Sequence, residues 1–128
     1  MLVLNWNLWW ATIRSARGKE IASIIQHHNP AVMCLTELTL GMLPSHGHSL
    51  SAEGSYGYPG AADRRKVSLW STAPWSEPDT IGHQDLPGGR FVSGITHGIR
   101  FVGVCIPWHA AHVANGTKDR EMWEDHLQ

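Results

Sequence analysis

The sequence has little cysteine, no long apolar run and almost no net charge, and each absence narrows what the chain can be. Its only two cysteines, Cys34 and Cys105, lie in apolar segments typical of strands, which favours buried free thiols over a disulfide framework. No segment approaches the ~20 consecutive apolar residues of a membrane span. The N-terminus also lacks the basic region of a signal peptide. We therefore expect a cytoplasmic protein.

Charge and aromatic content leave two questions open. The formal net charge is −1, so the chain lacks the basic excess of proteins that bind nucleic acid without sequence preference. A local basic cluster, Arg64, Arg65 and Lys66, keeps a nucleic-acid partner open. Seven tryptophans indicate either an aromatic rim around a cleft or a core built from large side chains. At 128 residues the chain is long enough for one domain with a core of its own.

Hydrophobic spacing predicts one helix followed by a series of strands. The helix extends from about Ala16 to His28, with Ser15 as its N-cap and isoleucines repeating along one face. Apolar runs predict strands over residues 2–7, 31–35, 66–72, 90–96 and 99–106. His97-Gly98 predicts a two-residue hairpin turn between the last two. Residues 39–63 and 73–89 are expected to be long connections, and a final helix is expected from Thr117 toward Gln128.

Two predicted strands each deliver one polar residue at their carboxyl ends. The run Leu2 to Asn7 ends in an amide, and the run beginning at Ala31 leads to the carboxylate of Glu37. Strand ends are where layered α/β proteins hold ligands, because rigid backbone meets solvent there. An amide beside a carboxylate suits Mg²⁺, which takes oxygen ligands and keeps several waters. Either residue alone is more commonly a polar group that satisfies a loop.

The segments Asn5-Trp6-Asn7, Pro30-Ala31-Val32 and Leu35-Thr36-Glu37 resemble the start of the endonuclease/exonuclease/phosphatase superfamily, the DNase I-like phosphodiesterases. The resemblance implies an α/β (α+β) fold, a layered sandwich present here in part, mainly as one mixed or antiparallel sheet with flanking helices. It also implies hydrolysis of a phosphate ester with Mg²⁺ or Mn²⁺, with Glu37 as the metal ligand and Asn7 beside it. Ala31 and Thr36 depart from the family pattern without touching the expected ligand.

The later family motifs are missing, so the sequence resembles an N-terminal half, and we expect a single truncated domain over residues 1–128. No Gly-Asp-x-Asn and no Ser-Asp-His is found, and Asp125-His126 falls in the expected final helix. Cys105 stands where the family usually places a His or Tyr near the phosphate. The resemblance offers His109 or His112 as its replacement, with His109 as the catalytic candidate, and Arg120 as a substrate contact.

Other functions stay open at this point. Cys105, His109 and His112, joined by His46 and His48, have a spacing that could hold Zn²⁺ in a non-catalytic module. A Trp-rich surface could instead make the chain a protein-interaction remnant, and an exposed sheet face could support a homo-oligomer. Within the phosphodiesterase hypothesis, nucleic acid, phospholipid, nucleotide and sugar phosphate all remain as substrates.

Overall fold

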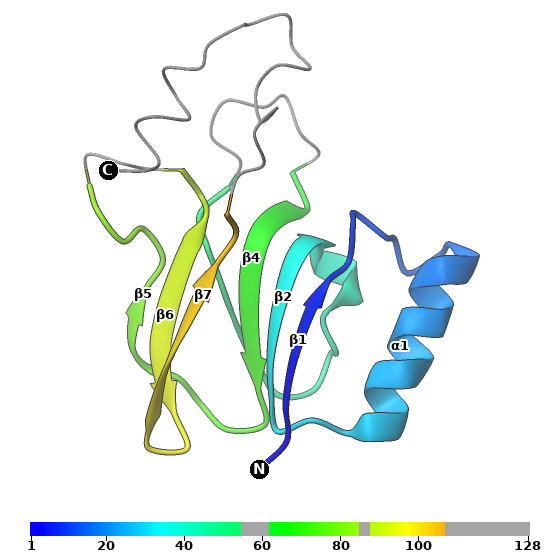
Figure 1. Ribbon diagram of the computed structural model, residues 1–128, viewed down its shortest axis with the longest axis horizontal. Helices are drawn as coiled ribbons and strands as arrows, with labels where there is room; N and C mark the ends of the chain where they lie inside the picture. Colours follow the sequence, from blue (N-terminus) through cyan, green and yellow to red (C-terminus); the bar gives the residue numbers. More distant parts are fainter. Residues whose placement is uncertain (55–61, 85–87, 107–128) are drawn as a thin grey trace, which may run out of the picture.

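Two β-sheets and one helix make up the part of the chain that the computed structural model describes, residues 1–54, 62–84 and 88–106 (Figure 1). The larger sheet contains four strands in the spatial order β1-β2-β4-β3; they are β1 (Val3–Asn7), β2 (Val32–Thr39), β3 (His48–Ser51) and β4 (Arg64–Ser71). β1 and β2 run parallel, and β4 is antiparallel to both of its neighbours. The smaller sheet is antiparallel, with β5 (Ser76–Asp79), β6 (Phe91–Thr96) and β7 (Ile99–Val104).

The helix α1 (Ala16–His28) connects β1 to β2 and has the boundaries that the sequence predicts. It begins where the Ser15 hydroxyl accepts a hydrogen bond from the backbone N–H of Gly18 at 3.0 Å. It ends at Asn29, whose backbone is left-handed with φ of 45° and donates to the Ile25 carbonyl at 2.9 Å. Ile21 and Ile25 are its buried apolar residues.

Two apolar cores lie on opposite faces of the larger sheet. The first fills the space between α1 and the sheet; its buried members are Leu8, Ala11, Ile21, Ile25, Met33, Leu35, Leu38, Met42 and Trp70. The second lies between the two sheets and contains Ala52, Val67, Leu69, Val92 and Cys105. β2 and β4 contribute to both layers, so the carboxyl end of β2 projects from a backbone that is packed on two sides, while β1 packs on the helix side alone.

The α/β class is confirmed, with one difference in its layers. The strands form two facing sheets rather than mainly one, since residues 91–104 pair with β5 and pack on β4 instead of extending the first sheet. The predicted hairpin is confirmed, because His97 and Gly98 both adopt left-handed backbone with φ of 51° and 73°. Both cysteines are free, as expected.

Three short elements lie where the sequence predicts connections. They are β3, the 3-10 helix η1 (Leu40–Met42) and β5, which contains Pro78 and occupies an edge of its sheet. The strand expected at 31–35 continues to Thr39. Within the described ranges no helix is long and apolar enough to cross a membrane. The expected final helix from Thr117 lies outside the described residues.

Candidate functional site

The structure places Asn7 and Glu37 at the same end of the larger sheet, where β1 and β2 both reach their carboxyl ends (Figure 1). The parallel pairing aligns Asn7 with Thr36, the residue before Glu37. Just beyond this pair, the backbone N–H of Leu8 donates to the Thr36 carbonyl at 2.9 Å. The adjacency that the strand-end pattern predicts is therefore present in the fold.

The turn after β1 is tied to both of these residues. The backbone N–H of Trp9 donates to Oδ1 of Asn7 at 2.8 Å, and that of Trp10 donates to the carbonyl of Glu37 at 2.7 Å. Trp9, Trp10 and Glu37 all have left-handed backbone, with φ of 45°, 60° and 49°. Such a conformation costs about 1–3 kcal/mol for each non-glycine residue and concentrates at functional sites. Three non-glycine residues with left-handed backbone therefore lie together at the ends of β1 and β2.

The left-handed Glu37 also changes the alternation of β2. Met33 and Leu35 pack on the α1 side, two residues apart as a regular strand requires. Leu38 lies in the same core although it is three residues beyond Leu35. The odd spacing shows that the strand is irregular at Glu37, which keeps this carboxylate partly exposed between two fully buried leucines.

The donor atoms at the two strand ends fit a hard divalent cation. Asn7 and Glu37 supply an amide and a carboxylate oxygen, and a carbonyl-type oxygen that accepts one hydrogen bond retains a second lone pair. Mg²⁺ is commonly held by one or two carboxylates while it keeps several waters. In the described part of the chain no group of three or more His, Cys, Asp and Glu side chains could hold a metal. The donor set thus matches Mg²⁺ or Mn²⁺ better than four-coordinate zinc.

Two cations lie near Cys105, the buried Lys66 of β4 and the half-buried Arg90 that precedes β6. Lys66 of β4 is 5% exposed, and its Nζ donates to the Gly88 carbonyl at 2.8 Å. Burial lowers the pKa of Lys66 to about 8, and the nearby Arg90 acts in the same direction. Arg90, just before β6, donates from Nη1 to the Cys105 carbonyl at 3.3 Å, while its Nε is buried without a hydrogen-bond partner in the described residues.

Cys105 connects this cationic group to Glu37. Burial raises the pKa of the Cys105 thiol, and the Glu37 carboxylate raises it further, while Arg90 and Lys66 oppose that change. Glu37, Lys66, Arg90 and Cys105 therefore share one electrostatic neighbourhood at the strand-end site. The position that the family resemblance singled out, Cys105, is close to the expected metal ligand.

Sequence reasoning missed part of this group. It grouped Lys66 with Arg64 and Arg65 as a local basic cluster, but Lys66 is buried while Arg64 is exposed, so Lys66 does not belong to a surface patch. Arg90 was not singled out at all. No local pattern could have identified it, since its approach to Lys66 depends on how the two sheets pack.

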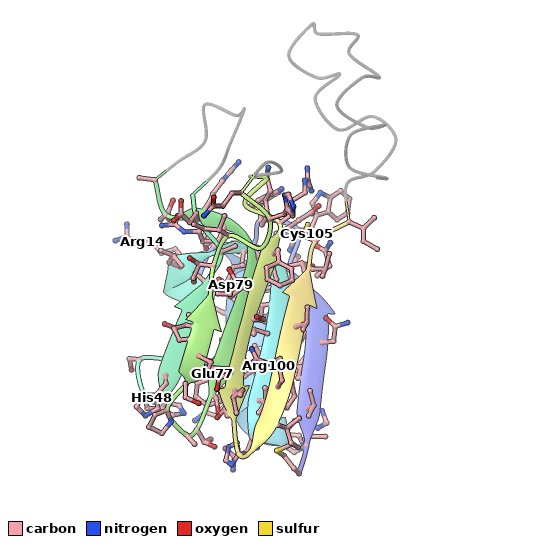
Figure 2. All side chains as sticks on the ribbon, turned by 90° about the vertical axis from the view of Figure 1, so that its left-hand side faces the viewer. Arg14, His48, Glu77, Asp79, Arg100 and Cys105 are labelled. Atoms are coloured by element: carbon pink, nitrogen blue, oxygen red, sulfur yellow. The ribbon has the colours of Figure 1, made fainter. Side chains whose placement is uncertain are left out.

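Other predicted site residues are not brought into the site. His109, His112 and Arg120 lie outside the described residues, as does Asp125-His126. His48 pairs with Ser71 at the far end of β4. Figure 2 shows His48 and Cys105 at opposite ends of the sandwich. His46 stacks edge-on against Trp70, with ring centroids 5.3 Å apart. A zinc site that combines His46 or His48 with Cys105 is therefore contradicted.

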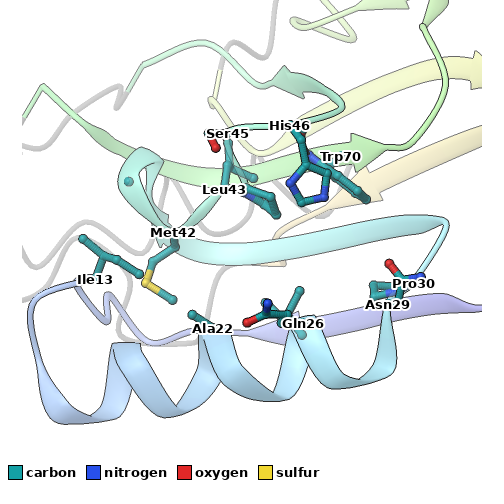
Figure 3. Close-up of a pocket in the computed structure, with 13 residues that line it drawn as sticks. Ile13, Ala22, Gln26, Asn29, Pro30, Met42, Leu43, Ser45, His46 and Trp70 are labelled. Carbon is teal, nitrogen blue, oxygen red and sulfur yellow. Dashed lines mark hydrogen bonds between the residues drawn. The ribbon is translucent and has the colours of Figure 1, made fainter.

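A separate groove of about 420 Å³ lies on the helix side of the larger sheet (Figure 3). Its walls come from α1, from η1 with the segment that follows it, and from β4. Gln26 and Asn29 line it on one side, and Met42, His46 and Trp70 on the other. Neither Asn7 nor Glu37 contributes to it, so the groove and the strand-end site are distinct.

Comparison with known proteins gives one family match and two similar structures. The sequence matches the family model described as Endonuclease/Exonuclease/phosphatase family over residues 4–128. The structure resembles an AP endonuclease from Archaeoglobus fulgidus, with a TM-score of 0.63 and 16% identity over 100% of this chain and 48% of that chain. It also resembles the endonuclease domain of TRAS1, a telomere-specific non-LTR retrotransposon, with a TM-score of 0.51 and 14% identity over 98% of this chain and 51% of that one.

These likenesses confirm the DNase I-like sandwich that the sequence predicts. At such low identity they establish the fold alone. The chain spans about half the length of the two endonucleases. No curated protein matches the sequence.

Proposed function

The chain belongs to the endonuclease/exonuclease/phosphatase family, and we propose that Asn7 and Glu37 are the metal-holding part of a Mg²⁺-dependent phosphodiesterase site. The observation that carries the proposal is their juxtaposition at the ends of two paired parallel strands, held by a turn that hydrogen-bonds to both residues. Mn²⁺ would be accepted by the same oxygen donors. When bound, the ion supplies charge neutralisation on the phosphoryl oxygens.

The chain's own residues would hold and orient the phosphate ester. Glu37 provides the anionic ligand, and the hydrogen bond from Trp9 to Asn7 fixes the direction of the amide. Arg90, Lys66 and Glu37 all act on Cys105, so the two cations would lie near the place where a dianionic transition state forms. The burial of Lys66 would strengthen that interaction, because water screens a buried charge less than an exposed one.

The remaining roles are assigned to residues outside the described ranges. The proposal gives His109 a catalytic role at the phosphate and Arg120 a contact to the substrate. In-line displacement also needs a positioned water and help for the leaving oxygen. Because the chain spans about half the length of the endonucleases it resembles, we propose that hydrolysis draws on groups from outside the described residues.

The experiment is hydrolysis of a phosphodiester in Mg²⁺ with Glu37→Gln, which keeps size and hydrogen-bonding capacity but removes the charge. Loss of the Glu37 carboxylate is expected to lower the rate by about 100-fold or more, the scale typical of a group that binds the transition-state charge. Glu20→Gln, on the exposed side of α1, is the matched control and should be unaffected. Equal rates for Glu37→Gln and the unaltered chain, or activity that persists in EDTA, would overturn the proposal.

A further inference from the structure

We propose that Trp9 is a stacking platform for a nucleobase of the substrate, an inference that rests on the proposed phosphodiesterase function and names nucleic acid as its substrate class. Trp9 is 73% exposed, in contrast to Trp70, which is 3% exposed in the helix-side core. An indole left in water forgoes the free energy of burying a large aromatic surface. Because Trp9 directly follows the strand-end site, we attribute its exposure to contact with the substrate.

The backbone of Trp9 is fixed rather than loose. Its N–H donates to Asn7, and the guanidinium of Arg17 donates from Nη2 to the carbonyls of Leu8 at 2.9 Å and Trp9 at 2.6 Å. Leu8, 1% exposed, anchors the start of the turn in the core. The left-handed φ of 45° at Trp9 is therefore imposed by its surroundings. The turn therefore fixes the backbone that carries the exposed indole.

Cations accompany the indoles of this turn. The Arg17 guanidinium carbon lies over the Trp9 ring, 5.8 Å from its centroid, and that of Arg64 lies 5.2 Å from the centroid of Trp10. Both arginines are exposed. Arg17 covers one face of the Trp9 ring, and the large exposed fraction leaves the other accessible. Aromatic rings that stack bases beside arginines that attract phosphates are the usual means of holding single-stranded nucleic acid.

The placement of the turn favours a nucleobase over a protein partner. Asn7 is two residues from Trp9 and is hydrogen-bonded to it, so a phosphate held at Asn7 and Glu37 has its neighbouring nucleotide near the indole. The side chains with recorded contacts to Trp9 are those of Asn7 and Arg17, an amide and a cation. A protein interface typically surrounds its aromatic anchors with a larger apolar patch. A chain of net charge −1 can still bind nucleic acid here, because the attraction is local.

The test is oligonucleotide binding measured by fluorescence anisotropy in EDTA, where no metal-dependent cleavage occurs. Two labelled 12-nucleotide single strands are compared at one low salt concentration: deoxythymidine, and a strand of abasic sugars with the same phosphates. The unaltered chain should bind the base-bearing strand more tightly. Trp9→Ala should weaken that binding by roughly 5- to 100-fold, the range for one stacked base, with little effect on the abasic strand. Trp9→Phe should retain most of the affinity.

Controls separate this inference from the proposed function and from a surface for protein. Ile99→Ala removes another exposed apolar side chain, 48% exposed, at the β6–β7 hairpin at the other end of the sandwich (Figure 1), and should bind both strands normally. Equal weakening for both strands, no effect of Trp9→Ala, or loss of self-association in that variant by sedimentation would each overturn the stacking role. Failure of hydrolysis with intact base-dependent binding would overturn only the proposed function.

Discussion

The backbone N–H of Trp10 donates to the carbonyl of Glu37 at 2.7 Å, and both residues adopt left-handed backbone. The β1–α1 turn is thereby joined to the one irregular position of β2. The same turn carries an exposed indole on its outer side and reaches Asn7 on its inner side. The candidate metal site and the proposed stacking surface are thus joined by one strained turn. A substitution at one of them should therefore alter the backbone conformation at the other.

Arg17→Met should loosen this turn. The variant keeps the aliphatic part of the side chain but loses the hydrogen bonds to the carbonyls of Leu8 and Trp9. Because Arg17 is exposed, we expect a loss of only about 1 kcal/mol in the free energy of unfolding, together with faster amide exchange at Trp9 and Trp10. Urea unfolding and hydrogen exchange measure the two effects. Arg14→Met, a nearby exposed arginine, should change neither; unchanged exchange in Arg17→Met would refute the anchoring role.

Gly18→Ala should destabilise the protein strongly. A Cβ at this position would lie 1.8 Å from the Thr12 carbonyl oxygen, so the first turn of α1 would have to move away from the loop before it. We expect the free energy of unfolding to fall by about 2 kcal/mol or more. Gly41→Ala is the matched control, since the nearest atom, Cγ2 of Ile13, would be at an ordinary 3.7 Å. Equal midpoints of thermal unfolding for the two variants would contradict the close approach of Gly18 to the Thr12 carbonyl.

Asp79 should contribute pH-dependent stability. The backbone N–H groups of Gly82 and Ile81 donate to its Oδ1 at 2.8 and 3.0 Å and hold the pKa of this carboxyl below its ordinary value. Stability from a lowered carboxyl pKa is present above the unfolded-state pKa and is lost as the pH falls through the folded-state value. Asp79→Ala should therefore be less stable than the unaltered chain at pH 7, with the gap closing below about pH 4. A gap that stays constant across urea titrations from pH 7 to 3 would contradict this assignment; Asp63→Ala is the control.

Asn7→Ala should affect both metal binding and the turn. The substitution removes an expected oxygen ligand and also the acceptor for the Trp9 N–H. We expect weaker Mn²⁺ binding and faster exchange of the Trp9 amide, whereas Asn5→Ala, an exposed asparagine on the same strand, should alter neither. If only metal binding changed, the hydrogen bond to Trp9 would not be what holds the turn.

Local signals identified the elements whose structure is decided locally. Ser15 and the isoleucine spacing fixed the helix, and His97-Gly98 identified the hairpin because both residues must take positive φ. β5 escaped prediction because Pro78 interrupts the pattern of a strand and is tolerated only at an edge. The second sheet was not expected because its placement depends on contacts between distant segments.

The same division applies to the site. Asn7 and Glu37 were predictable because strand ends follow from apolar runs, and parallel pairing then brings two such ends together. The Lys66–Arg90–Cys105 group was not, because it forms across the two sheets. The exposure of Trp9 could not be read from the sequence either, since a tryptophan after a strand packs inward as readily as it projects into solvent.

Binding of Mn²⁺ to the full chain, measured by electron paramagnetic resonance, tests the central claim most directly. The unaltered chain should bind one ion, Mg²⁺ should compete for it, and Glu37→Gln should weaken binding at least tenfold because the carboxylate ligand is lost. Glu20→Gln should bind as the unaltered chain does. Equal Mn²⁺ affinity in Glu37→Gln and the unaltered chain would show that the strand ends of β1 and β2 do not hold the metal.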